Sequence, residues 1–192
     1  TDEFLAFYRE AVDYMIELNR KGVEILERNA AIFLTKMLTP SDPNYLDLRS
    51  PCGAGVGQIA YNFDGDLFTC DEGRMVAQMG DDAFLIGNIE ESTYDEVVQH
   101  DAVKSIAVAS CVDGLPGCID CVYKPYCGVC PVYNYSEQGT IFGQMPTNER
   151  CKLYHGIQTY LFEWLSRDDQ EVLDIFSKWT IVRDRTVFFL HE

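Results

Sequence analysis

The sequence predicts an α+β fold, in which a small β-hairpin and a cysteine-rich region lie between helical segments at the two ends of the chain. Three observations predict it. Apolar residues recur at helical spacing at both ends, Asp64-Gly65 separates two alternating apolar runs, and six of the eight cysteines fall between Cys111 and Cys151. With 192 residues, 47% of them hydrophobic, the chain is long enough to bury the core of one ordinary domain with helical extensions.

The balance of charge narrows the classes of partner. The net charge is -16, from 31 acidic and 15 basic residues. Binding to a phosphate backbone needs clustered Lys and Arg, so nucleic acid is not expected as a partner.

No segment approaches the roughly 20 apolar residues that span a bilayer, and the start of the chain lacks the basic and apolar regions of a signal peptide. We therefore expect no membrane partner and a cytoplasmic location. Because the sequence begins without Met and enters a helical pattern at once, we also expect a piece of a longer polypeptide.

Two amphipathic helices are predicted near the start. The first covers residues 4–21 and ends at Gly22, and the second covers residues 23–38 and ends before a Pro-rich breaker at residues 40–43. Their spacing predicts as inward-facing residues Phe4, Phe7, Ala11, Tyr14, Met15 and Leu18 in the first helix, and Val23, Leu26, Ala30, Phe33 and Met37 in the second.

A hairpin is predicted between Cys52 and Cys70, because residues 58–63 alternate towards an Asp-Gly turn and residues 67–70 form the return run. The stretch from Cys111 to Cys151 has little periodicity, and we do not expect a conventional core to hold it. The remaining predicted elements are a short strand over 83–86, helices over 93–100 and 101–110, the second with Asp101 as N-cap, helices over 152–165 and 168–178, and a strand over 186–190.

The most informative motif is C-x2-C-x5-C-x2-C followed by proline, formed by Cys118, Cys121, Cys127 and Cys130. Four thiols so close in sequence force the backbone to wrap around a common centre, and iron-sulfur clusters are bound by such short-spaced sets. Zinc ribbons usually separate their two C-x2-C pairs by about 15 to 20 residues, far more than the gap here. Disulfides are less favoured because cytosolic reductants keep unliganded thiols reduced. The spacing therefore favours iron-sulfur clusters, with zinc and disulfides as the alternatives.

The full cysteine pattern resembles the SPASM domain, the auxiliary-cluster module of many radical S-adenosylmethionine (SAM) peptide maturases. The resemblance covers about residues 50–155: Cys52, then Gly65-x4-Cys70, then the C-x2-C-x5-C run, and a distal Cys151. It departs from the family pattern in having two residues, not three, between Cys127 and Cys130. The sequence around Cys52, Cys70 and Cys130 is similar, more narrowly, to that of the His-Xaa-Ser system radical SAM maturases.

The resemblance implies two 4Fe-4S clusters with interleaved ligands. The second cluster would take Cys118, Cys121, Cys127 and Cys151, and the first would take Cys52, Cys70 and Cys130 with Cys111 as the remaining thiol for the fourth position. The alternatives are an extra ligand from within the hairpin segment and an open iron in the first cluster, with Cys111 then a small buried apolar residue. The implied domains are residues 1–48 as the end of a missing radical SAM barrel and a bridge, 49–155 as the SPASM domain, and 156–192 as a C-terminal helical extension.

The SAM-cleaving motif C-x3-C-x2-C is absent, so no catalytic residue is expected in this chain. The resemblance implies that the complete protein uses SAM to modify a ribosomal peptide, with these clusters transferring electrons or positioning the peptide, and that the partners are that peptide and the missing barrel. A zinc-stabilised protein-interaction module and a self-contained ferredoxin-like carrier are the alternatives. Arg74 is a candidate for tuning the first cluster, although a surface ion pair with Asp71 or Glu72 is favoured for it.

Overall fold

The computed structural model describes residues 1–180 of the chain and divides into two compact units. One unit combines residues 1–43 with the chain from Leu153 onward, and the other runs from Asn44 to Lys152. The second unit contains all eight cysteines. The strand expected over residues 186–190 lies outside the described residues. Within the described part of the chain, no helix is long and apolar enough to cross a membrane.

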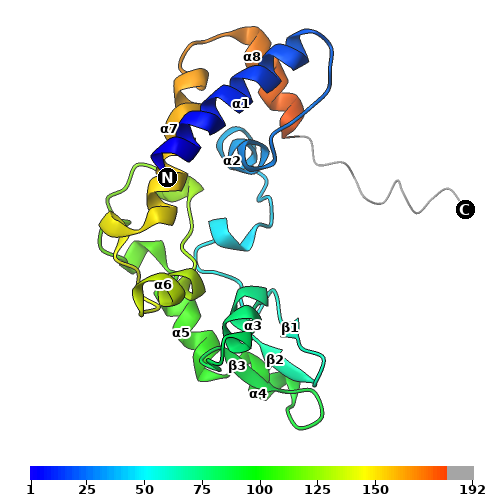
Figure 1. Cartoon of the computed structure of the whole chain (residues 1–192), viewed down its shortest axis with the longest axis vertical. Coiled ribbons are helices and arrows are strands. Elements are labelled where there is room, and N and C mark those ends of the chain that lie inside the picture. Colours follow the sequence, from blue (N-terminus) through cyan, green and yellow to red (C-terminus); the bar gives the residue numbers. More distant parts are fainter. Residues whose placement is uncertain (181–192) are drawn as a thin grey trace, which may run out of the picture. The chain divides into compact units, whose positions relative to one another are not determined.

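The helical unit is built from α1 (Asp2–Arg20), α2 (Arg28–Leu38), most of α7 (Glu149–Leu165) and α8 (Gln170–Trp179), and α8 packs on both α1 and α2 (Figure 1). The first helix ends as predicted, with Gly22 at φ +84°. The second begins later than predicted because the Glu27 carboxylate accepts hydrogen bonds from the backbone N–H groups of Asn29 and Ala30 and so caps it.

The buried face of α1 differs from the predicted one. Tyr8, Val12 and Ile16 are buried at four-residue spacing, whereas Phe4, Phe7 and Tyr14 are 46%, 67% and 64% exposed. In α2, Ala30 and Phe33 are buried as expected, and Val23 and Leu26 lie before the helix and are exposed. Two apolar stripes compete on α1, and the sequence alone does not say which of them meets the other helices.

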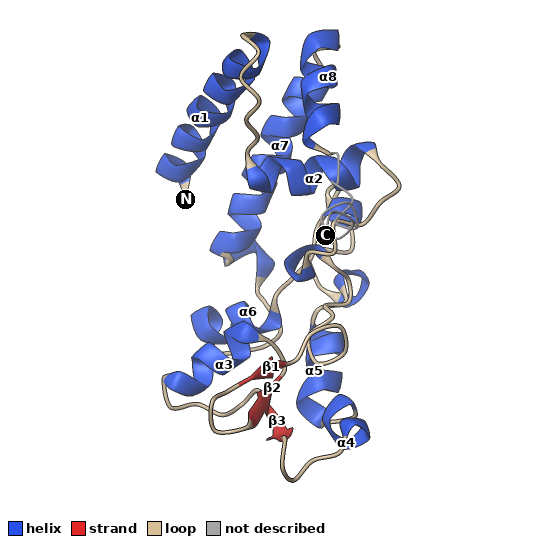
Figure 2. Ribbon diagram, turned by 90° about the vertical axis from the view of Figure 1, so that its right-hand side faces the viewer, coloured by secondary structure: helices blue, strands red, loops and turns tan. Residues whose placement is uncertain are grey.

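The cysteine-rich unit contains a three-stranded antiparallel sheet of β1 (Ala60–Tyr61), β2 (Asp66–Phe68) and β3 (Leu85–Asn88), in that order. The predicted hairpin is confirmed: Ala60 pairs with Phe68, and Gly65 takes φ +90° in the turn. Figure 2 shows α3 (Asp71–Gln78) on one side of this sheet and α4 (Tyr94–Val98) and α5 (Asp101–Ala109) on the other. The N-cap of α5 is His100, whose Nδ1 accepts from the Ala102 N–H at 3.2 Å; the expectation of Asp101 was wrong.

The stretch from Cys111 to Cys151 has more order of its own than the sequence predicted. It contains α6 (Pro131–Gln138) and three short 3-10 helices, of which the first is Val112–Gly114. It also contains a small apolar cluster of Val112, Leu115, Val129 and Met145. Val129 and Met145 lie far from Val112 and Leu115 in sequence, so the cluster forms no periodic pattern that the sequence could reveal.

Candidate metal centres

Three cysteines meet beside the hairpin. Cys70 and Cys130 are buried in one apolar cluster, and Cys52 packs against it half-buried. We call Cys52, Cys70 and Cys130 the hairpin set. Burial raises the pKa of the Cys52 thiol to about 11 and that of Cys70 to about 12, and also raises that of Cys130. These thiols keep their protons unless a cation replaces them, so metal binding here would release protons.

Two thiols of the hairpin set stand at helix N-termini. Cys70 is the N-cap of α3, and its Sγ accepts from the Gly73 N–H at 3.4 Å. Cys130 is the N-cap of α6, and its Sγ accepts from the Tyr133 N–H at 3.5 Å. Backbone N–H groups and the positive ends of two helices favour negative charge on these sulfurs, and hydrogen bonds to sulfur are a known control on cluster potential. The donor set therefore fits an anionic thiolate-bound group.

Four of the five remaining thiols form a second group, the loop set, made of Cys118, Cys121, Cys127 and Cys151. Cys118 and Cys151 pack against one apolar cluster. Burial, together with neighbouring cysteines of the set, raises the pKa of Cys118 and of Cys127 to about 11. Mutual influence of this kind requires the sulfurs to lie near one another. The loop set therefore brings together three thiols from one short run and one from the start of a helix.

Gly128 lies between Cys127 of the loop set and Cys130 of the hairpin set, and it is packed tightly. A Cβ at this position would lie 2.5 Å from the Asp47 backbone oxygen, 2.7 Å from Leu48 Cα and 2.8 Å from Arg49 N. These are all backbone atoms, so they cannot turn aside as a side chain could. The contact holds the step from Cys127 to Cys130 against the 3-10 helix η1 (Leu46–Leu48).

A buried amide pair holds Cys151 in the loop set. Asn148 Nδ2 donates to Asn134 Oδ1 at 2.9 Å, and Asn148 Oδ1 accepts from the Cys151 N–H at 3.1 Å. Asn134 Nδ2 donates in turn to the Ile141 carbonyl at 3.3 Å. The pair joins α6 to the first turn of α7, and so ties the distal cysteine to the run that holds the other three.

Replacing Asn148 with alanine is expected to lower the free energy of unfolding by about 2 kcal/mol, because the first turn of α7 loses its cap and the buried Asn134 oxygen loses its donor. A shift of the urea midpoint of the full chain measures this change. Thr147→Ala, at the neighbouring exposed residue, is the control and is expected to stay within about 0.5 kcal/mol of the parent. Equal midpoints for the two variants would show that the amide pair contributes nothing.

Cys111 belongs to neither set, but hydrogen bonds join its segment to the segment that carries Cys52. The Cys52 N–H donates to Ser110 Oγ at 2.8 Å, and the Val112 N–H donates to Ser50 Oγ at 3.0 Å. The residues on both sides of Cys111 are thus tied to the segment that carries Cys52. Its thiol is half-buried. Among the described residues, no three histidine, cysteine, aspartate or glutamate side chains already surround a single point closely enough to hold one metal ion.

Charged residues that the sequence did not single out surround the hairpin set. Ionised Asp47 and Glu72 each raise the pKa of Cys52 and Cys130, and the Arg150 guanidinium lowers that of Cys130. Glu72 could have been noticed in the sequence, because it lies two residues after Cys70, in the first turn of α3. Arg150 had none beyond its place next to Cys151. Arg74, which the sequence did single out, forms a surface ion pair with Asp71 at 3.1 Å.

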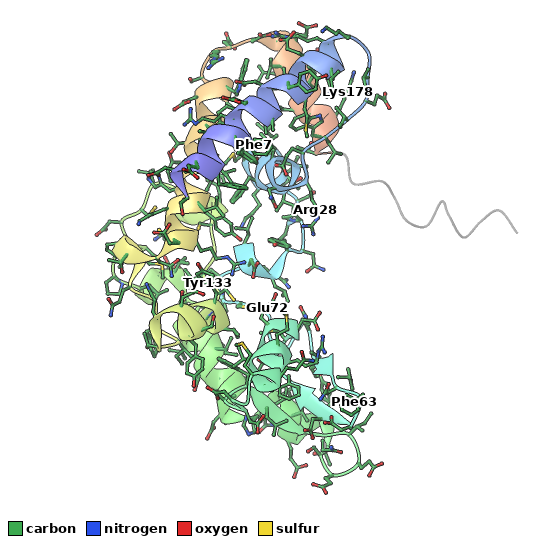
Figure 3. The ribbon with its side chains drawn as sticks, viewed as in Figure 1. Phe7, Arg28, Phe63, Glu72, Tyr133 and Lys178 are labelled. Atoms are coloured by element: carbon green, nitrogen blue, oxygen red, sulfur yellow. The ribbon has the colours of Figure 1, made fainter. Side chains whose placement is uncertain are left out.

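A groove of about 580 Å³ opens between α3 and α6 beside the hairpin set. Met75, Met79, Val132 and Tyr133 line it, and Glu72 and Arg150 add one charge of each sign. Figure 3 labels Glu72 and Tyr133 on these two neighbouring helices. Methionine side chains adapt to different apolar partners, so the groove has the character of an adaptable contact surface.

Comparisons with known proteins agree with this fold. No family model matches the chain. An uncharacterized protein of Archaeoglobus fulgidus is 25% identical over 167 residues, which cover 86% of this chain and 38% of that protein. The structure of hexahistidine-tagged anSMEcpe with bound AdoMet (S-adenosylmethionine) has a TM-score of 0.67 and 18% identity, and the match covers 93% of this chain and 44% of that one. The chain therefore shares the fold of the matching part of anSMEcpe.

Two further similar structures are native anSMEcpe with bound AdoMet and a peptide. The one with the Cp18Cys peptide has a TM-score of 0.66 at 18% identity, covering 89% of this chain and 44% of that one. The one with the Kp18Cys peptide has a TM-score of 0.63 at 19% identity, covering 86% and 42%. The chain thus spans less than half the length of each protein it matches. The predicted α+β fold class is confirmed.

Proposed function

We propose that this chain binds two 4Fe-4S clusters and is the auxiliary-cluster part of a radical SAM enzyme that modifies a ribosomal peptide. One cluster belongs to the hairpin set, with Cys111 as its fourth ligand, and the other belongs to the loop set. The observation that carries the proposal is the grouping of seven thiols into two sets that interleave along the chain, in which Cys130 lies with Cys52 and Cys70 and not with Cys127. The resemblance to SPASM domains implies this same interleaving.

The chemistry of the site supports clusters of this kind. All the proposed ligands are thiols, the donor that iron-sulfur clusters use. When bound, such clusters supply one-electron transfer over potentials from about -700 to about +450 mV. The chain's own residues would set where in that range each cluster lies, by donating backbone N–H groups to Cys70 and Cys130 and by limiting access of water through burial.

The exposed face of α1 supports the proposed missing barrel. Phe4, Phe7 and Tyr14 follow helical spacing on one face and are largely exposed, and Figure 3 labels Phe7 there. We propose that residues 1–48 are the last helices of the barrel and the bridge from it, so that this face packs on the preceding part of a longer protein. Residues 49–155 would then be the SPASM domain and 156–192 its helical extension. The AdoMet seen in anSMEcpe would be bound by that barrel and not by this chain.

A peptide is the proposed substrate, because two of the similar structures hold one. The more specific relation to the His-Xaa-Ser system maturases is part of the proposal and rests on the sequence around Cys52, Cys70 and Cys130. The proposed setting is the cytoplasm. The second candidate function, a zinc-stabilised interaction module, is favoured by the thiol-only donor set, which zinc also accepts.

Anaerobic purification followed by iron, sulfide and zinc analysis separates these functions. We expect about eight iron and about eight sulfide per chain, together with a broad visible absorption, because two four-iron clusters require them. A colourless protein with about two zinc ions per chain would contradict the proposal and support the interaction module. Four iron atoms would leave one set without a cluster and would require the ligand assignment to be revised.

A further inference from the structure

Arg150 lies between the two cysteine sets. It directly precedes Cys151 of the loop set, but its side chain is engaged by residues next to the hairpin set. Its guanidinium forms an ion pair with Asp47, and its Cζ lies 5.1 Å from the centre of the Tyr133 ring. The Tyr133 backbone N–H donates to Cys130 Sγ at 3.5 Å. Tyr133 therefore contacts the Arg150 guanidinium through its ring and the Cys130 thiol through its backbone N–H.

The position of this charge is well defined. The side chains of Arg150 and Asp47 are 23% and 14% exposed, so water and salt screen them less than they screen a surface pair. The guanidinium also makes a cation–π contact with the Tyr133 ring. Arginine also keeps its charge at every physiological pH. A permanent, partly buried cation is thus held beside Cys130.

We propose that Arg150 tunes the cluster of the hairpin set by offsetting the negative charge of Asp47, which would otherwise lower the reduction potential of that cluster. This inference rests on the proposed function. Reduction adds one electron to a cluster and makes or breaks no bond, so the reduced form is more negative by one charge. A nearby cation stabilises that form, and the stabilisation falls with distance. Because Arg150 contacts Asp47 and Tyr133, and Tyr133 is hydrogen-bonded to Cys130, the hairpin-set cluster is affected more than the loop-set cluster.

The test is an EPR-monitored redox titration of reconstituted protein in the Cys127→Ala background, which leaves the hairpin-set cluster alone. We expect Arg150→Gln to lower its equilibrium constant for reduction by about tenfold, which is about 59 mV for a one-electron couple. Arg150→Lys keeps the charge and is expected to keep most of the potential. In the Cys70→Ala background, the loop-set cluster is expected to shift less.

A rescue variant separates charge from structure. Arg150→Gln leaves the buried Asp47 carboxylate without its guanidinium, so the double variant Asp47→Asn/Arg150→Gln removes both charges and is expected to restore most of the potential. Arg74→Gln is the matched control, because Arg74 pairs with Asp71 at the surface, where Asp71 is 64% exposed. It is expected to leave both potentials unchanged.

Three results would overturn the inference in distinguishable ways. If Arg150→Gln retains its iron and its potential, the charge does not tune the cluster. If Arg150→Gln and Arg150→Lys both lose iron and the double variant does not recover it, the residue has a purely structural role. If the parent protein itself takes up zinc and shows no redox signal, the proposed function fails and this inference fails with it.

Discussion

Cys127→Ala is expected to halve the iron content of the reconstituted chain, from about eight to about four atoms. Cys127 belongs to the loop set, in which ionised Cys118, Cys121 and Cys151 all act on its pKa. Removing one of four thiolates opens that cluster to solvent and to loss of iron, whereas the hairpin set keeps its own ligands. The measurement is iron and sulfide per chain after anaerobic reconstitution, with the visible spectrum retained at about half intensity.

Cys70→Ala is the matched variant on the hairpin set. It is expected to cause the same loss, and the two substitutions together are expected to remove nearly all iron. A Cys127→Ala protein that loses all of its iron would show that the two sets do not fold independently. One that keeps all eight would contradict the loop-set assignment. Cys111→Ala bears on the fourth position separately, because partial loss confined to one cluster would support Cys111 as its ligand.

Gly128→Ala is expected to lower the free energy of unfolding of the chain by about 3 kcal/mol and to reduce the iron of both sets. The added methyl group would meet three backbone atoms of residues 47–49 at 2.5 to 2.8 Å. Relief requires moving either η1 or the step between Cys127 and Cys130, and that step carries one ligand of each set. The measurements are the urea midpoint and the iron content of the same preparation.

Gly114→Ala is the control for this substitution. Gly114 is exposed and has nothing within 4 Å of an added Cβ. It is expected to leave the iron content unchanged and to stabilise the chain slightly, because alanine restricts the unfolded state more than glycine does. If Gly128→Ala behaved like Gly114→Ala, the packing of Gly128 on residues 47–49 would not be what holds the two sets in place.

Parts of both units were predictable where the determinants are local. The Asp64-Gly65 turn lies within the hairpin that it forms, and Gly22 ends α1 through its own positive φ. Short spacing likewise brings Cys118, Cys121 and Cys127 together, since a chain of ten residues has few ways to keep them apart. Element boundaries were less predictable where a side chain outside the apolar pattern acts as a cap, as Glu27 does for α2.

The sequence by itself determined the α+β class, the hairpin and the short-range thiol run, because periodicity, turn chemistry and residue spacing each act over a few residues. Only the tertiary structure decided which stripe of α1 is buried, that Gly128 packs on η1, and that Arg150 and Asp47 meet beside Cys130. These contacts join residues far apart in the chain: Arg150 and Asp47 are 103 positions apart. Their energies depend on packing and on the local dielectric constant, and both are set by the folded structure.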